Sequence, residues 1–130
     1  MLDVTCAIIE KDDKVLCAQR SAQMSHALKW EFPGGKLEPG ETLAACLKRE
    51  IKEELSLDIA IREALPPSKH TYSSTKIICL HPFICTIQAG IVNLKEHKQI
   101  AWLALSELKA LDWAEADIPV LDYYLALKQA

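Results

Sequence analysis

The sequence predicts an α/β protein in which a mixed β-sheet is sandwiched between helices. Three observations predict this fold class. Strand-like segments recur along the chain and pair mostly as hairpins, one amphipathic helix follows a glycine-rich turn, and a second helix closes the chain. Helices combined with strands in this way cover both faces of a sheet. Because 130 residues can bury one core and no linker or repeat divides them, we expect residues 1–130 to form a single domain.

The first half of the chain begins with two strands and ends with a helix. Residues 4–9 and 15–20 are β-prone, and the polar residues 11–14 between them predict a hairpin turn. Residues 21–29 are polar and irregular, so we expect a loop there. A helix is predicted over residues 42–55, with Thr42 as its N-cap.

The second half predicts short strands and a closing helix. Pro66 and Pro67 break the chain, and Pro82 interrupts a long β-prone segment. The predicted strands are residues 57–61, 77–87, 90–94 and 100–103. The predicted helices are residues 106–110 and 118–127, the second with Val120, Leu121, Tyr124 and Leu127 at helical spacing.

Three glutamates of the central helix border its apolar stripe. Counted from Glu50, Glu53 lies about 60° to one side of the helix and Glu54 about 40° to the other. Glu50 and Glu54 are also like charges four residues apart, which costs a few tenths of a kcal/mol. Crowded carboxylates take up protons or bind a cation, and oxygen ligands without histidine or cysteine suit Mg²⁺ or Mn²⁺ rather than zinc. The alternative is an ordinary charged surface helix.

The segment GGKLEPGETLAACLKREIKEELSL resembles the Nudix box, the signature of hydrolases that cleave nucleoside diphosphates linked to another group. The matching positions are Gly35, Glu41, Arg49, Glu50, Ile51, Glu53, Glu54 and Leu57. Ser56 stands where the family has glycine. Since that glycine is a left-handed C-cap, serine there strains the backbone by about 1 kcal/mol or moves the helix end. We expect a shifted cap and an intact set of ligands.

The Nudix resemblance implies the Nudix fold, an α/β/α sandwich, and a metal site carried over residue by residue. The implied ligands are the carboxylates of Glu50, Glu53 and Glu54 and the carbonyl of Gly35. One of the glutamates orients or deprotonates the attacking water, and the resemblance leaves open which one. Arg49, four residues before Glu53, can pair with it and hold its rotamer.

The segment LKWEFPGGKLEPGE, which runs into the box, and residues 96–127 resemble the MutT branch, which clears oxidised purine nucleotides, and its relatives that hydrolyse cytidine triphosphates. The resemblance implies that Glu96, six residues before Trp102, reaches the metals; an exposed loop acid is the alternative. It implies a base contact for Asp117, although this residue can also cap the last helix. Arg20 matches a nucleotide-contacting position, and a surface arginine is the equal alternative.

Charge and cysteine content limit the possible partners. The formal net charge of −3 provides no basic face, so we expect no nucleic-acid polymer as ligand. The five cysteines show no CxxC spacing and are interpreted as free thiols in a reducing cytoplasm. No stretch is long enough to span a membrane. The four histidines form no spaced cluster and are given no role, and the oligomeric state stays open.

The resemblance therefore implies a Mg²⁺-dependent nucleoside triphosphate pyrophosphohydrolase. In the MutT group, water attacks the β-phosphorus and releases a nucleoside monophosphate and pyrophosphate. The leading expected substrate is an oxidised or modified nucleotide such as 8-oxo-dGTP, in a sanitation role linked to DNA repair. The alternatives are a CTP or dCTP pyrophosphohydrolase and a non-catalytic nucleotide-binding module.

Overall fold

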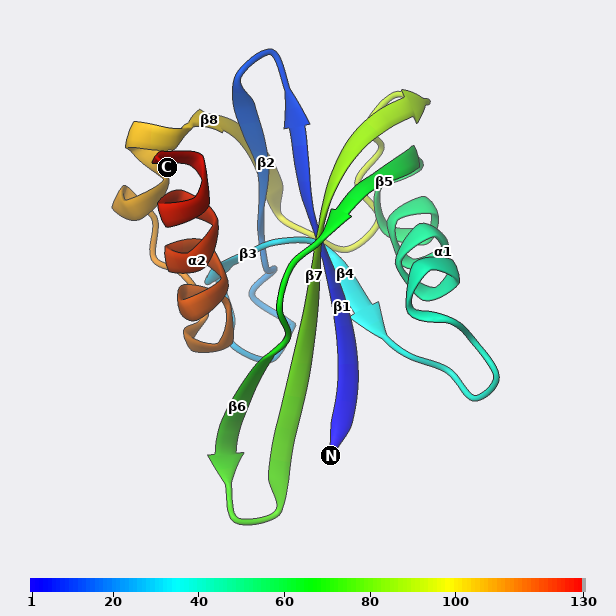
Figure 1. Ribbon diagram of the computed structural model, residues 1–130, viewed down its shortest axis with the longest axis vertical. Helices are drawn as coiled ribbons and strands as arrows, with labels where there is room; N and C mark the ends of the chain where they lie inside the picture. Colours follow the sequence, from blue (N-terminus) through cyan, green and yellow to red (C-terminus); the bar gives the residue numbers. More distant parts are fainter. Residues whose placement is uncertain (130) are drawn as a thin grey trace.

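The computed structural model describes residues 1–129, which form a mixed sheet with a helix on either side (Figure 1). The strands are β1 (Leu2–Lys11), β2 (Lys14–Gln19), β3 (Trp30–Glu31), β4 (Gly34–Lys36), β5 (Asp58–Ala64), β6 (Ser68–Ser73), β7 (Lys76–Ala89) and β8 (Gln99–Ala104). The helices are α1 (Leu43–Leu55) and α2 (Ile118–Gln129), with the 3₁₀ turns η1 (Leu105–Ala110) and η2 (Glu115–Asp117). No helix within residues 1–129 is long and apolar enough to cross a membrane.

The sheet is organised around β1 and β7, which run parallel to each other. The main strand order is β3-β2-β1-β7-β5, while β4 pairs with β1, β6 with β7 and β8 with β2. The other pairings between these eight strands are antiparallel. In Figure 1 helix α1 lies on one side of this sheet and α2 on the other, which confirms the predicted α/β sandwich.

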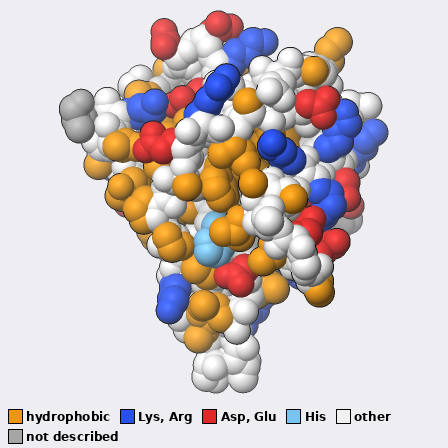
Figure 2. All heavy atoms as spheres, turned by 45° about the vertical axis from the view of Figure 1, so that its right-hand side comes forward, with side chains coloured by type: hydrophobic (Ala, Val, Ile, Leu, Met, Phe, Trp, Pro, Cys, Tyr) orange, Lys and Arg blue, Asp and Glu red, His pale blue; other side chains and the backbone are white. Residues whose placement is uncertain are grey.

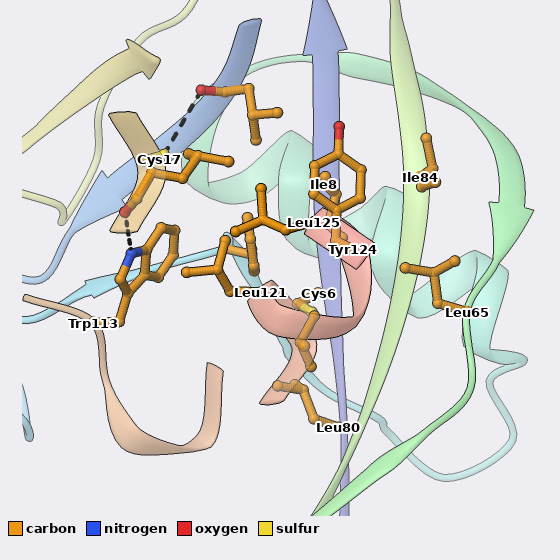
Figure 3. Close-up of a cluster of buried hydrophobic side chains, with 14 residues drawn as sticks. Cys6, Ile8, Cys17, Leu65, Leu80, Ile84, Trp113, Leu121, Tyr124 and Leu125 are labelled. Carbon is orange, nitrogen blue, oxygen red and sulfur yellow. Dashed lines mark hydrogen bonds between the residues drawn. The ribbon is translucent and has the colours of Figure 1, made fainter. Parts of the chain in front are cut away.

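The alternation of side chains along β1 builds a core on each side of the sheet. Ala7 and Ile9 point toward α1 and belong to the same buried cluster as Leu47 and Ile51 of that helix. Cys6 and Ile8 point the other way and pack with Leu121 and Tyr124 of α2 (Figure 3). These two clusters fix the positions of α1 and α2 relative to the sheet.

Pro82 was expected to interrupt the long β-prone segment, but β7 continues through it. On one side of β7, the partner β6 ends its pairing at Leu80 and β5 begins its pairing at Phe83. Pro82 therefore falls in the gap between two partner strands, where the missing N–H removes no hydrogen bond of those two ladders. Its carbonyl still accepts a hydrogen bond from Leu65, at 3.0 Å.

The strand predicted for residues 90–94 does not form. This segment instead lies against the end of α1, where Asn93 N–H donates to the carbonyl of Leu55 (2.9 Å) and Lys95 N–H to that of Glu54 (3.3 Å). The last carbonyls of a helix have no partner within the helix, so they accept these hydrogen bonds from the loop. The short strands β3, β4 and β6 were not predicted.

The expected shift of the α1 cap was also wrong. The helix ends at Leu55, and Ser56 itself takes the left-handed conformation (φ 61°, ψ 31°), its N–H donating to Lys52 carbonyl at 3.0 Å. Gly90 packs tightly here, since a Cβ atom on it would lie 2.5 Å from the carbonyl oxygen of Ser56. The backbone of Ser56 is therefore strained, and the helix ends at the residue where the family glycine would end it.

Candidate active site

The glycine loop brings the backbone into direct contact with the helix that follows it. A Cβ atom on Gly35 would lie 2.2 Å from the carboxyl carbon of Glu50, and one on Gly34 would lie 2.0 Å from the carbonyl oxygen of Thr5. Only glycine allows both approaches. The Gly35 carbonyl accepts a hydrogen bond from the Thr5 hydroxyl at 3.2 Å. Its predicted role as a metal ligand stays a prediction.

Arg49 is the centre of an ion-pair network between α1 and the glycine loop. Its guanidinium holds Glu41 with two hydrogen bonds (2.7 and 2.9 Å) and contacts Glu50 at 2.9 Å and Glu53 at 3.3 Å. The two-fold contact with Arg49 lowers the pKa of Glu41 to about 2. The predicted pairing with Glu53 is present, but the shorter contacts tie the glycine loop to the helix through Glu41.

The three box glutamates occupy different environments. The side chain of Glu53 is 59% exposed, whereas those of Glu50 and Glu54 are only 17% and 19% exposed. Burial, followed by the charges of Glu31 and Glu50, raises the pKa of Glu54 to about 9. Within residues 1–129 its buried Oε2 has no hydrogen-bond partner. A buried carboxyl crowded by other acids and lacking a donor is suited to bind a cation.

His97 and Glu31 belong to this site although the sequence provided no reason to include them. His97 Nε2 lies 2.8 Å from Glu31 Oε2, and its Nδ1 lies 4.0 Å from Glu54 Oε2. The second carboxylate oxygen of Glu31 accepts a hydrogen bond from Arg20 at 2.8 Å. These side chains connect the predicted nucleotide contact Arg20 to the metal-site candidate Glu54. His97 and Glu31 are 66 positions apart, so no local pattern could have paired them.

Glu96 lies in the exposed loop that follows the Lys95 contact with α1. Its charge is among those that raise the pKa of Glu54, which places the two carboxyl groups near each other. Whether Glu96 reaches the metal stays a prediction.

A cavity of about 230 Å³ opens between β1, the loop after β2 and η2. Gly35 and Glu54 line it together with Arg20 and Asp117. The structure thus brings four of the predicted site residues, from four separate segments, around one cavity. Tyr72 of β6 also lines it and stacks on His26, with ring centroids 5.1 Å apart.

Asp117 lines this cavity and is 8% exposed. Its Oδ2 accepts a hydrogen bond from the backbone N–H of Phe32 at 2.9 Å, a contact across 85 positions rather than to the first turn of α2. Burial, assisted by the charge of Glu31, raises the pKa of Asp117 to about 8. The carboxyl is therefore mostly neutral at pH 7 and presents one donor and one acceptor.

Arg20, which lines the same cavity, is held in place by several contacts. Its side chain is 18% exposed, and besides Glu31 it donates to the backbone carbonyl and hydroxyl of Ser25, at 2.6 and 3.0 Å. A guanidinium fixed in this way can meet an anionic or base-edge group without further ordering.

The carboxylates, the glycine loop and the adjoining cavity define a site that can hold a divalent cation and a phosphorylated ligand. The NUDIX domain model matches residues 1–124, and the chain therefore belongs to the Nudix hydrolase family, as the box predicted. Nudix hydrolases generally use a divalent metal. The carboxylate oxygens around the unpartnered Glu54 oxygen fit such an ion. The expectation that no histidine lies beside the carboxylates was wrong, because His97 Nδ1 is 4.0 Å from Glu54 Oε2.

Similar proteins match most or all of the chain. The CTP pyrophosphohydrolase of Escherichia coli K12 is 38% identical over 130 residues, which cover 100% of this chain and 96% of that protein. A putative 8-oxo-dGTP diphosphatase 2 of Mycobacterium tuberculosis is 32% identical over 114 residues, covering 88% and 81%. The solution structure of the E. coli ORF135 protein superposes with a TM-score of 0.85 at 38% identity, covering 98% and 91%.

Proposed function

We propose that this protein is a Mg²⁺-dependent pyrophosphohydrolase that converts a nucleoside triphosphate to the monophosphate and pyrophosphate. The observation that carries the proposal is the shared cavity, in which Glu54 and Gly35 line the same space as Arg20 and Asp117. A substrate whose base reaches Asp117 can extend its phosphates toward the glutamates. Glu50, Glu53 and Glu54 would hold the Mg²⁺ ion, which when bound would neutralise charge on the phosphate oxygens.

The protein's own residues supply positioning and proton transfer. Arg49 holds Glu50 and the glycine loop in register through its contact with Glu41. In the proposed step, water attacks the β-phosphorus, the bond from that phosphorus to the oxygen of the α-phosphate breaks, and a box glutamate takes the proton of the water. Glu96 is proposed as a further metal ligand, since its charge acts on Glu54.

The neutral carboxyl of Asp117 is the proposed contact for the base. One donor beside one acceptor complements O6 and N7–H of 8-oxoguanine, whereas unoxidised guanine has no proton on N7. This pattern admits an oxidised or modified nucleotide such as 8-oxo-dGTP, which we keep as the first candidate substrate. Cytosine, with N3 and the N4 amino group, meets the same carboxyl equally well.

A CTP or dCTP substrate is the second candidate, and the 38% identity to the E. coli CTP pyrophosphohydrolase over the full chain favours it. In either case the free, buried state of all five cysteines supports the proposal that the enzyme works in a reducing compartment such as the cytoplasm. Figure 2 shows a face on which basic and acidic side chains are interspersed, which supports a small nucleotide rather than a nucleic-acid polymer as ligand.

A nucleotide panel tests the proposal. The purified protein is incubated with Mg²⁺ and 8-oxo-dGTP, dGTP, CTP, dCTP or dTTP, and pyrophosphate and monophosphate are measured. Pyrophosphate release that requires Mg²⁺ supports the enzyme, and the ranking of the nucleotides selects the substrate class. Thermal stabilisation by a nucleotide without turnover would show a binding module instead.

A further inference from the structure

Asp3, Cys79 and His81 lie together at the end of the sheet where β1 begins. In the parallel pairing of β1 with β7, Asp3 is opposite Cys79 and Thr5 is opposite His81. Alternate residues of a strand share one face, so these side chains lie on the face that α1 covers farther along, at Ala7 and Ile9. None of the three lines the nucleotide cavity.

The three side chains present their donor atoms to one another. His81 Nε2 is 2.9 Å from Asp3 Oδ1, and one ligand atom from each of the three residues, the sulfur in the case of Cys79, lies within 4.8 Å of the other two. Tetrahedral coordination at the usual bond lengths of about 2.0–2.3 Å separates ligand atoms by about 3.3–3.6 Å. The largest present separation, at most 4.8 Å, exceeds that value by no more than about 1.2–1.5 Å, so the three side chains must close in slightly for an ion to bind.

The donor set differs in kind from that of the box glutamates. A thiolate, an imidazole and a carboxylate suit zinc and similar transition metals, whereas Mg²⁺ selects oxygen ligands. Cys79 is buried, but the side chains of His81 and Asp3 are 19% and 41% exposed, so solvent can complete the coordination from the open side. A partly exposed histidine–aspartate pair by itself adds little stability. A histidine–aspartate pair needs no thiol beside it, so the adjacent Cys79 is the feature that points to a metal site.

We propose that Asp3, Cys79 and His81 form a second metal site that binds Zn²⁺ or a similar transition-metal ion, with solvent as the fourth ligand. Binding displaces the thiol proton, and the neutral imidazole of His81 must carry its proton on Nδ1 so that Nε2 can face the ion. The ion would tie β1 to β7 at their exposed ends. It would also steady the segment after β4, because Leu37 N–H donates to the Asp3 carbonyl at 3.0 Å.

Cobalt titration tests this site independently of hydrolysis. Metal-stripped protein is titrated with Co²⁺ in excess Mg²⁺, which keeps the carboxylate site supplied, and the ligand-to-metal charge-transfer absorption of a cobalt–thiolate bond is recorded. We expect saturation at one Co²⁺ per chain and displacement by Zn²⁺. Carboxylate ligands alone produce no such band, so the box glutamates cannot imitate the signal.

The matched variants are Cys79→Ala and Cys85→Ala, since both cysteines lie on β7 and on the same face. Cys79→Ala should abolish the band, and Cys85→Ala should keep it. His81→Ala and Asp3→Asn, at partly exposed positions, should each weaken binding by about tenfold or more. The proposal is overturned if wild-type protein shows no band, if Cys79→Ala retains it, or if His81→Ala and Asp3→Asn bind Co²⁺ as tightly as wild type.

Discussion

Replacing Asp117 by asparagine should change how the stability of the protein depends on pH. The folded protein holds this carboxyl neutral up to a pKa of about 8, whereas the usual value for an aspartate is 3.8. Asparagine has nearly the same shape and an oxygen that can still accept the hydrogen bond from Phe32 N–H. The substitution therefore removes the titration and preserves the contact.

The magnitude follows from the proton balance. Between about pH 4 and 8 the folded protein keeps a proton that the unfolded chain releases, so this group favours folding fully below that window and loses its contribution as pH rises through it. The wild-type free energy of unfolding should fall by about 1.4 kcal/mol per pH unit from this group alone. Relative to wild type, Asp117→Asn should gain about 3 kcal/mol between about pH 5 and about pH 7.

Urea unfolding of both proteins in EDTA, at several pH values across this window, measures that difference. Other groups such as Glu54 titrate in both proteins and largely cancel in the comparison. Asp13→Asn, in the exposed turn after β1, is the control, since it removes a carboxyl that is not buried. A difference from wild type that does not change with pH for Asp117→Asn would show that this carboxyl is ionised in the fold, and the argument for a neutral base contact would fail.

Three further predictions address the site and the fold. Glu54→Gln should lower kcat by about 10²-fold or more while the urea midpoint at pH 7 holds or rises, because a buried, crowded acid is removed; full turnover would refute its role. Asp117→Ala should reorder the nucleotide panel, and an equal loss for every base would argue against base contact. Ser56→Gly should raise the free energy of unfolding by about 1 kcal/mol in thermal or urea melts, since glycine adopts φ 61° without strain; an unchanged value would refute that strain.

Features that depend on neighbouring residues were predictable from the sequence. Helix α1 begins after Thr42, whose hydroxyl accepts from Ala45 N–H at 3.1 Å, and it ends at Leu55, where the periodic pattern stops. The spacing of Gly35, Glu41 and Glu50 encodes a loop that folds back on its own helix. Such signals survive in sequence because the interacting groups lie within one or two helical turns or one loop of each other.

Short and polar strands carried no usable signal. The burial of β6 alternates between intermediate and exposed residues, and its sequence SKHTYS is polar on both faces, so no apolar period of two appears. Strands β3 and β4 have two and three residues, too few for any periodicity. Their positions come from pairing with β2 and β1, which only the folded chain brings near.

By itself the sequence determined the family, the central helix and the acids that helix presents. Only the tertiary structure decided the surroundings of the reactive side chains. It places His97 beside Glu54 and Cys79 beside Asp3, and it lets Phe32 N–H donate a hydrogen bond to Asp117. The physical reason is that burial and proximity set the pKa and the ligand geometry of a side chain, and both arise from contacts between segments whose separation along the chain leaves no periodic trace.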